Sequence, residues 1–336
     1  MKRLLTCLPA LFLLAVACHK QEAKAPESDL QEEESTVISR RSCGTYDVLQ
    51  EQLKADPGLE RRMQEIETYT SRVLQNPATY RLAGDTIEIP VVVHVLYRTA
   101  EQNISDAQVQ SQIAVLNEDY KNKNADRTKL PANSFQSVAS SGLKVRFVLA
   151  QTIHKATTVK SWSTNDAVKS SNRKGDDPID PAHNLNIWVC NLGQSLLGYA
   201  QFPGGSLATD GVVILYSAFG SKARYPAGTY VASYDLGRTT THEVGHWMNL
   251  RHIWGDDGGA CSGSDLVTDT PNQGSENYGT PTYPHVSCSN GPTGDMFMNY
   301  MDYTDDISMY MFSAKQKERM LAIFTSSGPR ASFATP

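Results

Sequence analysis

Beyond its first residues the sequence has no long hydrophobic run, few cysteines and no long run of basic residues. No segment after residue 17 approaches the roughly twenty apolar residues that a membrane-spanning helix needs, so none is expected to cross a membrane. The net charge of -5 is mild, which argues against nucleic-acid binding as a main role. No internal repeat is visible, and 336 residues suffice for one sizeable folded unit and a smaller segment.

Residues 1–17 predict a signal for export. Two basic residues precede an apolar run from Leu4 to Ala17, which is too short to span a membrane. Ala15-Val16-Ala17 fits a signal-peptidase site, and with Cys18 it also approximates a bacterial lipobox, in which Cys18 would carry lipid. A secreted protein and a lipoprotein of the bacterial cell envelope therefore both remain open. Residues 18–42 are rich in Glu, Lys and Ser and are predicted to form a flexible tether.

The most informative motif runs from His242 to His252. His242 and His246 are four residues apart, so on a helix they share a face and can bind one metal ion. His252 can join them only if the helix ends near Asn249, a residue type that tolerates the left-handed conformation of a helix stop. Three imidazoles leave one open position on a tetrahedral zinc ion, as in catalytic sites. Glu243 is then placed to act as the general base.

Two further motifs flank this one, Leu197–Pro203 upstream and Met298–Tyr303 downstream. Together with the histidines they resemble the pappalysin (cytophagalysin) family of metallopeptidases, a branch of the metzincins, over residues 87–324. Metzincins usually carry Gly where this chain has Asn249. The resemblance implies a zinc endopeptidase that prefers to cut before Arg. It also implies that Met301 lies beneath the zinc as a hydrophobic floor and that Tyr303 points its hydroxyl at the oxyanion.

The expected fold class is an α/β (α+β) zincin of the metzincin type. A twisted mixed sheet with helices would form the N-terminal lobe, an irregular C-terminal lobe would follow, and the zinc cleft would lie between them. Ser105 and Gln108 predict a capping box on one helix, and another capped helix begins near Ser313. Strands are predicted at residues 87–97, 143–149, 185–190 and 211–216, and the edge strand that would pair with an extended peptide contains Gly198, Tyr199 and Ala200.

Four cysteines remain after the export signal and Cys18. The family carries a disulfide in the loop after the zinc helix, which implies a bridge between Cys261 and Cys288. Cys43 precedes the first predicted strand, and its thiolate can occupy the open zinc position, as in the cysteine-switch pro-segment of the family. A disulfide from Cys43 to Cys190 is the alternative. The predicted pro-segment spans residues 43–80, with a helix from Leu59, and the catalytic domain spans residues 81–336.

Two more sites complete the prediction. Asp265, Asp269 and Thr270 offer oxygen ligands for calcium in a glycine-rich loop, where family members carry that ion. Asp305 or Asp306 would supply a carboxylate for the Arg that follows the cut. The sequence thus predicts an exported, latent zinc endopeptidase that acts on proteins or peptides. Two rivals stay open: a surface-anchored zinc-containing binding lipoprotein without proteolytic activity, and a zinc enzyme that attacks a non-peptide bond.

Overall fold

The computed structural model describes residues 38–78 and 86–334, which belong to one folded unit. The export signal, Cys18, residues 18–37 of the predicted tether and the predicted domain boundary at residue 81 lie outside the described residues. Residues 40–42 pack into the folded unit rather than continuing the predicted tether, and the side chain of Arg41 is buried. None of the described helices is both long and apolar enough to span a membrane.

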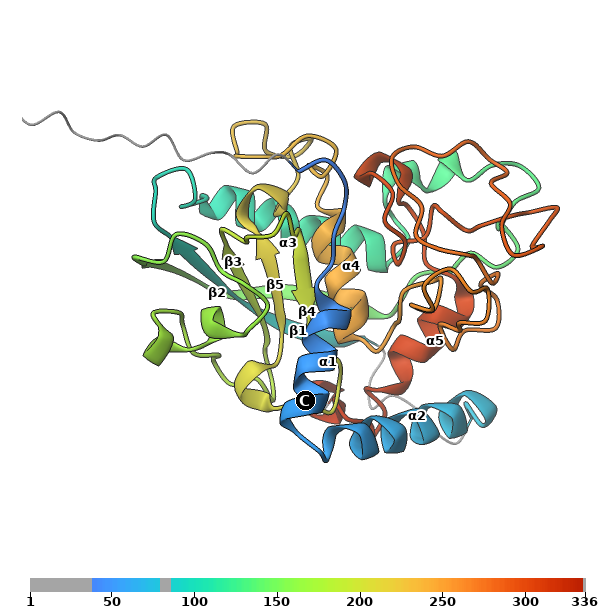
Figure 1. Ribbon diagram of the computed structural model, residues 1–336, viewed down its shortest axis with the longest axis horizontal. Helices are drawn as coiled ribbons and strands as arrows, with labels where there is room; N and C mark the ends of the chain where they lie inside the picture. Colours follow the sequence, from blue (N-terminus) through green and yellow to red (C-terminus); the bar gives the residue numbers. More distant parts are fainter. Residues whose placement is uncertain (1–37, 79–85, 335–336) are drawn as a thin grey trace, which may run out of the picture. The chain divides into compact units, whose positions relative to one another are not determined.

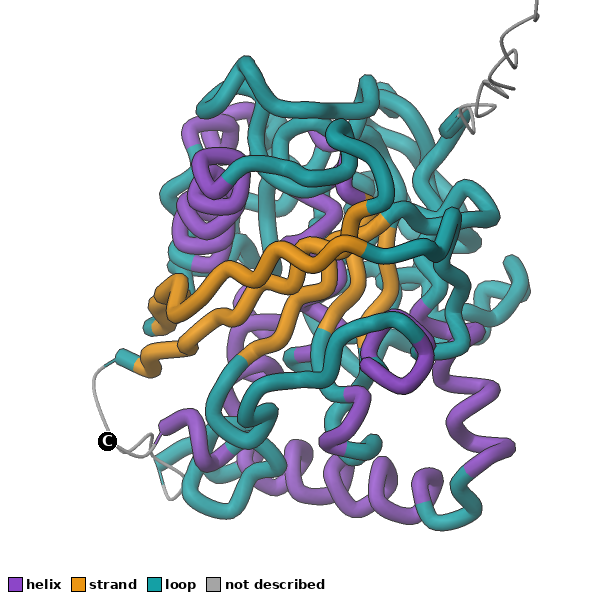
Figure 2. The backbone as a smooth tube through the Cα atoms, turned by 90° about the vertical axis from the view of Figure 1, so that its left-hand side faces the viewer, coloured by secondary structure: helices purple, strands orange, loops and turns teal. Residues whose placement is uncertain are grey.

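A five-stranded mixed sheet forms the centre of the fold, in the order β2-β1-β3-β5-β4. β1 (Ile87–Tyr97), β2 (Val145–Ala156), β3 (Leu185–Cys190) and β5 (Val212–Leu215) run parallel to one another. β4 (Gly198–Ala200) pairs antiparallel with β5 and is an edge strand, as predicted. Figure 2 shows the strands as one twisted layer with helices and loops on both sides.

The two faces of the sheet contribute to two separate hydrophobic clusters. Alternate strand residues such as Val93 and Ile187 pack against α3 (Asp106–Tyr120) and α4 (Arg238–Trp247). The residues between them, such as Trp188, belong to a second cluster that also contains Val48 of α1 (Thr45–Ala55). This division follows from the period of two along a strand, and because both faces are buried the strands are continuously apolar.

The two helices that precede the sheet pack against elements from later in the chain. α1 contacts β4, and α2 (Leu59–Gln75) contacts α5 (Ala314–Ala322), as Figure 1 shows. The predicted capping box at Ser313 is present on α5. At α3 the hydroxyl of Ser105 accepts a hydrogen bond from the Gln108 backbone, but the Gln108 amide does not complete the predicted box. That amide donates instead to backbone carbonyls of the loop that follows β5.

The residues after α4 have little regular structure, which confirms the irregular C-terminal lobe. α5 is the longest regular element there among the described residues, and the long loop between α4 and α5 carries the disulfide between Cys261 and Cys288. Short 3-10 helices connect the larger elements and span Ala125–Lys129, Ala167–Lys169, Ser171–Arg173, Leu207–Thr209, Tyr216–Ala218, Asp306–Ser308 and Ala331–Ala334.

A buried ion pair holds the end of the described chain against α4. The guanidinium of Arg330 donates to both carboxylate oxygens of Asp210, at 2.6 and 2.9 Å, and to the carbonyl of Trp247 at 3.0 Å. It lies 3.8 Å above the centre of the Trp247 ring. Since both charged side chains are almost fully buried, removing one of them leaves the other charge without a partner.

We expect Arg330→Met to lower the free energy of unfolding by about 3 kcal/mol, because Asp210 is left buried and unpaired. The matched control is Arg61→Met, since Arg61 forms an exposed pair with Glu65 and such pairs contribute about 0.5 kcal/mol or less. Urea-induced unfolding followed by circular dichroism measures both effects. Equal losses in the two variants would contradict the role given to the buried pair.

Candidate metal centre

The three histidines predicted to bind metal converge on one point. Nε2 of His246 lies 3.1 Å from Nε2 of His242 and 3.1 Å from Nε2 of His252. Zinc–nitrogen bonds of about 2.0–2.1 Å in tetrahedral geometry place the nitrogens about 3.3 Å apart, so the observed spacing suits one shared zinc ion. All three side chains are buried. The donor set and its spacing therefore fit the predicted ion.

Each imidazole is oriented by a hydrogen bond from its other nitrogen. Nδ1 of His242 lies 2.7 Å from the Tyr300 carbonyl, and Nδ1 of His246 lies 2.8 Å from the Leu250 carbonyl. Nδ1 of His252 lies 2.7 Å from a carboxylate oxygen of Asp256. These acceptors require the proton on Nδ1, which leaves the Nε2 lone pairs for the metal. Burial also lowers the pKa of His242 and of His246, which favours the neutral, metal-binding form.

Asp256 was missed as a partner of the metal centre by the sequence analysis. It lies four residues after His252 and at the start of the loop that was predicted to hold calcium. A carboxylate close behind a metal-binding histidine is the sequence signal that could have identified it, since such histidines commonly donate to a carboxylate.

The predicted chain reversal at Asn249 is present. Asn249 has φ 72°, the left-handed conformation of a helix stop. Its backbone N–H donates to the carbonyl of His246, and the N–H of Leu250 donates to the carbonyl of Gly245. This turn brings His252 to the other two imidazoles. Asn suits this position because it tolerates a positive φ better than most residues do.

Met301 packs directly beneath the histidine helix, where a hydrophobic floor was predicted. A Cβ atom added to Gly245 would lie 2.5 Å from the Met301 sulfur, so only glycine at this position of α4 allows the two segments to approach so closely. Met301 is fully buried. Its backbone N–H donates to the side chain of Asn299 at 2.9 Å, which shapes the turn.

Cys43 lies at the same point as the histidines. Its sulfur and the three imidazole nitrogens lie within 4.8 Å of one another. The Cys43 sulfur is 3.3 Å from a carboxylate oxygen of Glu243, and that oxygen also accepts a hydrogen bond from Thr45 at 3.0 Å. The hydroxyl of Tyr303 lies 3.3 Å from both the backbone N–H and the carbonyl of Cys43. The predicted switch, base and oxyanion donor therefore occupy one small volume.

The surroundings shift the pKa values of both Cys43 and Glu243. Burial and the neighbouring Glu243 raise the pKa of Cys43. Burial raises the pKa of Glu243 to about 7, against the hydrogen bonds from Cys43 and Thr45, which lower it. A carboxylate that titrates near neutrality can both accept and return a proton. Cys190 is a free, buried thiol, so the alternative disulfide between Cys43 and Cys190 is wrong.

The segment around Cys43 is bound to β4 by main-chain hydrogen bonds. The Gly44 N–H donates to the Gly198 carbonyl, and the Leu197 N–H donates to the Ser42 carbonyl, both at 2.9 Å. The bridge between Cys43 and Gly198 is parallel. The edge strand therefore pairs with an extended chain segment in this structure. Tyr199 and Ala200 of the same strand are buried, and the Ala200 N–H donates to the Thr45 hydroxyl.

Arg41 enters a polar pocket two residues before Cys43. Its guanidinium donates to Asp306 at 2.5 Å, to the Thr239 hydroxyl at 3.1 Å and to the Thr304 carbonyl at 3.2 Å. The other oxygen of Asp306 accepts from two backbone N–H groups that precede α4 or begin it. Of the two predicted carboxylates, Asp306 therefore contacts a guanidinium, whereas Asp305 is only partly buried.

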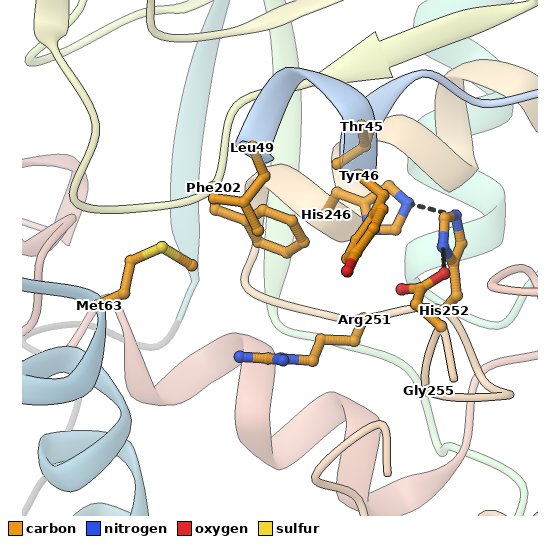
Figure 3. Close-up of a pocket in the computed structure, with 10 residues that line it drawn as sticks. Thr45, Tyr46, Leu49, Met63, Phe202, His246, Arg251, His252 and Gly255 are labelled. Atoms are coloured by element: carbon orange, nitrogen blue, oxygen red, sulfur yellow. Dashed lines mark hydrogen bonds and ion pairs between the residues drawn. The ribbon is translucent and has the colours of Figure 1, made fainter. Parts of the chain in front are cut away.

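A pocket of about 160 Å³ opens beside the metal centre. Figure 3 shows the residues that line it, which come from α1, from α2, from the segment containing Phe202 and from the histidine segment. Arg251 and Asp256 also line it. The described residues before the sheet thus cover the metal centre on this side.

Comparison with known proteins decides the family. Residues 175–325 match the family model described as peptidase M43, pregnancy-associated plasma protein-A. An extracellular metalloprotease of Colletotrichum graminicola is 34% identical over 255 residues, covering 72% of this chain and 78% of that protein. The chain belongs to the peptidase M43 family. This M43 peptidase is therefore a metallopeptidase, as predicted, and membership implies zinc at the histidine cluster.

Two solved structures resemble this M43 peptidase closely. Mature mirolysin of Tannerella forsythia in complex with a cleaved peptide is 48% identical, with a TM-score of 0.71, covering 74% of this chain and 96% of that one. A promirolysin variant from the same organism is 44% identical, with a TM-score of 0.77, covering 87% and 97%. These matches confirm the predicted fold class.

The predicted calcium residues form hydrogen bonds with different partners in this M43 peptidase. Thr270 donates from its hydroxyl to Asp265 at 2.8 Å, whereas the carboxylate of Asp269 accepts from the Ser313 hydroxyl and the Lys315 backbone at the start of α5. Burial raises the pKa of Asp265 to about 6. Asp269 thus serves as a cap for α5, a contact between distant segments that sequence spacing does not reveal.

We expect Asn249→Ala to lower the free energy of unfolding by about 1 kcal/mol, because a left-handed backbone costs ordinary residues about that much. Asn249→Gly is the matched variant and should be at least as stable as wild type, since Gly adopts this conformation freely. The Asn249 amide nitrogen has no hydrogen-bond partner among the described residues, so its loss should cost little. Chemical unfolding with zinc present measures both. A stable Ala variant beside a destabilised Gly variant would contradict this account.

Proposed function

We propose that this metallopeptidase is an exported zinc endopeptidase, made as a latent precursor, that hydrolyses peptide bonds preceding Arg. The observation that carries the proposal is the position of residues 41–45, which fill the cleft with a thiol at the histidines and a guanidinium on Asp306. Export is supported by the relatives described as extracellular metalloproteases. Lipid on Cys18 stays a prediction, since that residue lies outside the described part of the chain.

His242, His246 and His252 would hold the zinc ion. When bound, zinc would polarise the scissile carbonyl and lower the pKa of a water molecule. Glu243 would accept a proton from the attacking water and return it to the leaving amine, a role that its place next to His242 on α4 suits. The Tyr303 hydroxyl, which faces the Cys43 backbone in the precursor, would donate to the developing oxyanion.

Latency follows from the direction of the segment that fills the cleft. In a substrate cut before Arg, the Arg follows the scissile bond. Followed from its N-terminus, such a substrate would therefore pass the metal first and reach Asp306 second. In the precursor Arg41 precedes Cys43, so the chain passes through in the opposite direction. No peptide bond of a reversed chain is presented to Glu243 in the substrate geometry. The thiol at the histidines would also take the open position on zinc.

A removable pro-segment is supported by the relatives of known structure. The promirolysin variant covers 87% of this chain, whereas mature mirolysin covers 74%. The additional match would correspond to residues such as those of α1 and α2, which precede the sheet. Activation would then remove Cys43 and Arg41 together.

Calcium stays a prediction for Asp265, Asp269 and Thr270. Among the described residues, the only group of three or more His, Cys, Asp or Glu side chains spaced to share a metal ion is the one formed by Cys43 and the three histidines. Binding of calcium to the loop would require Asp269 to leave the start of α5.

We expect Glu243→Ala to lower kcat/KM for Arg-containing peptides by about 10²–10⁴-fold, the usual contribution of a general base. Zinc content should stay at that of wild type, because Glu243 is not among the three predicted ligands. Both proteins are freed of the pro-segment by an added protease, and then assayed for peptide hydrolysis and bound zinc. Equal activity in the two would refute the role of Glu243.

Cys43→Ala should mature faster than wild type, because the precursor loses the thiolate that fills the open zinc position. Cys190→Ala is the matched control, since that thiol is also free but is buried in the sheet away from the histidines. Gel electrophoresis over time, with purified precursors, follows the appearance of the mature form. If Cys43→Ala matures no faster than the control, the switch is wrong.

Asp306→Asn should reduce the preference for Arg over Gln after the cut by about 10–100-fold, because a charge-assisted hydrogen bond contributes about 1.5–3 kcal/mol. Asp305→Asn removes the neighbouring carboxylate and should leave the preference unchanged. The ratio of kcat/KM for two peptides that differ only at this residue measures the effect. An unchanged ratio in Asp306→Asn would exclude Asp306 as the Arg-binding carboxylate.

A further inference from the structure

An acidic residue stands on the face of α2 that packs against the rest of the protein. Leu59, Thr70 and Val73 mark this face, since all three are buried. Glu67 lies on the same face and accepts two parallel hydrogen bonds from Arg319, at 2.7 and 2.5 Å. Side chains on the inward face of such a helix are usually apolar, so the carboxylate has a specific partner rather than a general packing role.

Arg319 belongs to α5 and is fixed there by the metal-binding segment. Its Nε donates at 2.8 Å to the carbonyl of Asn249, the residue at which the chain reverses between His246 and His252. Its side chain is only 1% exposed, whereas that of Glu67 is 28% exposed. The Arg319 guanidinium is thus held by its own side of the interface, and its two Nη groups point at the carboxylate of Glu67.

The ion pair between Glu67 and Arg319 lies near the part of the cleft that the chain reaches after Cys43. Met63 is one helical turn before Glu67 on α2 and therefore shares its face, and Met63 lines the pocket that also contains His246 and His252 (Figure 3). If the precursor segment is reversed, as in the proposed function on which this inference rests, residues after Cys43 lie where a substrate has the residues before its cut. α2 therefore covers the nonprimed side of the cleft.

Loss of α2 would leave the Arg319 guanidinium without its carboxylate. Nε of Arg319 would stay bonded to the Asn249 carbonyl, so the two Nη groups would be held in place for another carboxylate. Asp265 is close enough to act on Arg319 electrostatically, but its two oxygens already accept from Val267 and Thr270. The exposed Arg251 lines the adjoining pocket and adds positive charge there.

We propose that Arg319 forms a carboxylate-binding subsite on the nonprimed side of the mature enzyme, which takes an acidic side chain of the substrate and which Glu67 fills in the precursor. The planar guanidinium matches a carboxylate through two parallel hydrogen bonds, so Asp or Glu is selected over its amide. The site binds without reacting, and no bond is formed or broken at Arg319.

A peptide scan on the wild-type enzyme, freed of its pro-segment, tests the subsite without any mutation. Every peptide has Arg after the scissile bond, and a single Glu is moved from the second to the sixth nonprimed position, each with a Gln twin. We expect kcat/KM to be about tenfold higher for Glu than for Gln at one of these positions, equivalent to about 1.4 kcal/mol. Equal rates for Glu and Gln at every position would overturn the proposal. Failure to cut any peptide would instead contradict the proposed function.

Arg319→Gln then tests the residue itself. The ratio of kcat/KM for the Glu peptide to that for its Gln twin should fall to about one. The ratio is the readout because Arg319 also binds the Asn249 carbonyl, so its loss can change the rate for both peptides. Arg251→Gln is the matched control and should keep most of the preference, since Arg251 is not paired with Glu67. A Glu preference that survives in Arg319→Gln would overturn the assignment. If that variant does not fold, the wild-type scan remains decisive.

Discussion

Three imidazole nitrogens meet at one point because the chain reverses at Asn249, and the rest of the centre is built around that reversal. The helix alone can align only His242 and His246. The left-handed turn brings His252 to these two histidines, where its Nδ1 lies within hydrogen-bonding distance of Asp256. Two residues of the C-terminal lobe stabilise this turn. Arg319 donates to the carbonyl of Asn249, and Met301 packs under α4, the helix that precedes the turn. The irregular lobe is therefore a support for the metal site as well as a wall of the cleft.

The segment that fills the cleft is attached through several independent kinds of contact. Cys43 approaches the histidines, the backbone on either side pairs with β4, Arg41 pairs with Asp306, and Glu67 pairs with Arg319. Two of these contacts are ion pairs with a buried partner, in which a lone charge is costly. The body of the enzyme thus presents one buried carboxylate and one buried guanidinium, each matched by the opposite charge from the preceding segment.

Much of this arrangement could be predicted because the relevant signals are local. β1 was predicted with the observed ends from its β-branched residues, and α5 from its capping box. The histidine motif and the turn at Asn249 also follow from spacing alone. α1 was not predicted, and its placement depends on contacts with the distant strand β4. Arg41 was assigned to the tether and Gln108 to a capping box, since in each case the true partner is a distant segment that no local pattern reveals. The contact of Asp269 with the start of α5 was missed for the same reason, while its role in calcium binding stays a prediction.

The pairing of Arg41 with Asp306 has a consequence for how this enzyme can diverge. In the proposed scheme the Asp306 carboxylate both selects the substrate and binds the inhibitory segment. Substrate preference and latency therefore both depend on the residue at position 306. A lineage that exchanged Asp306 for a neutral or basic residue would alter substrate choice and weaken latency in the same step. Such a change would persist only with a compensating change at position 41. Substrate preference and zymogen control are therefore expected to evolve as a covarying pair, with charge at position 41 following charge at position 306.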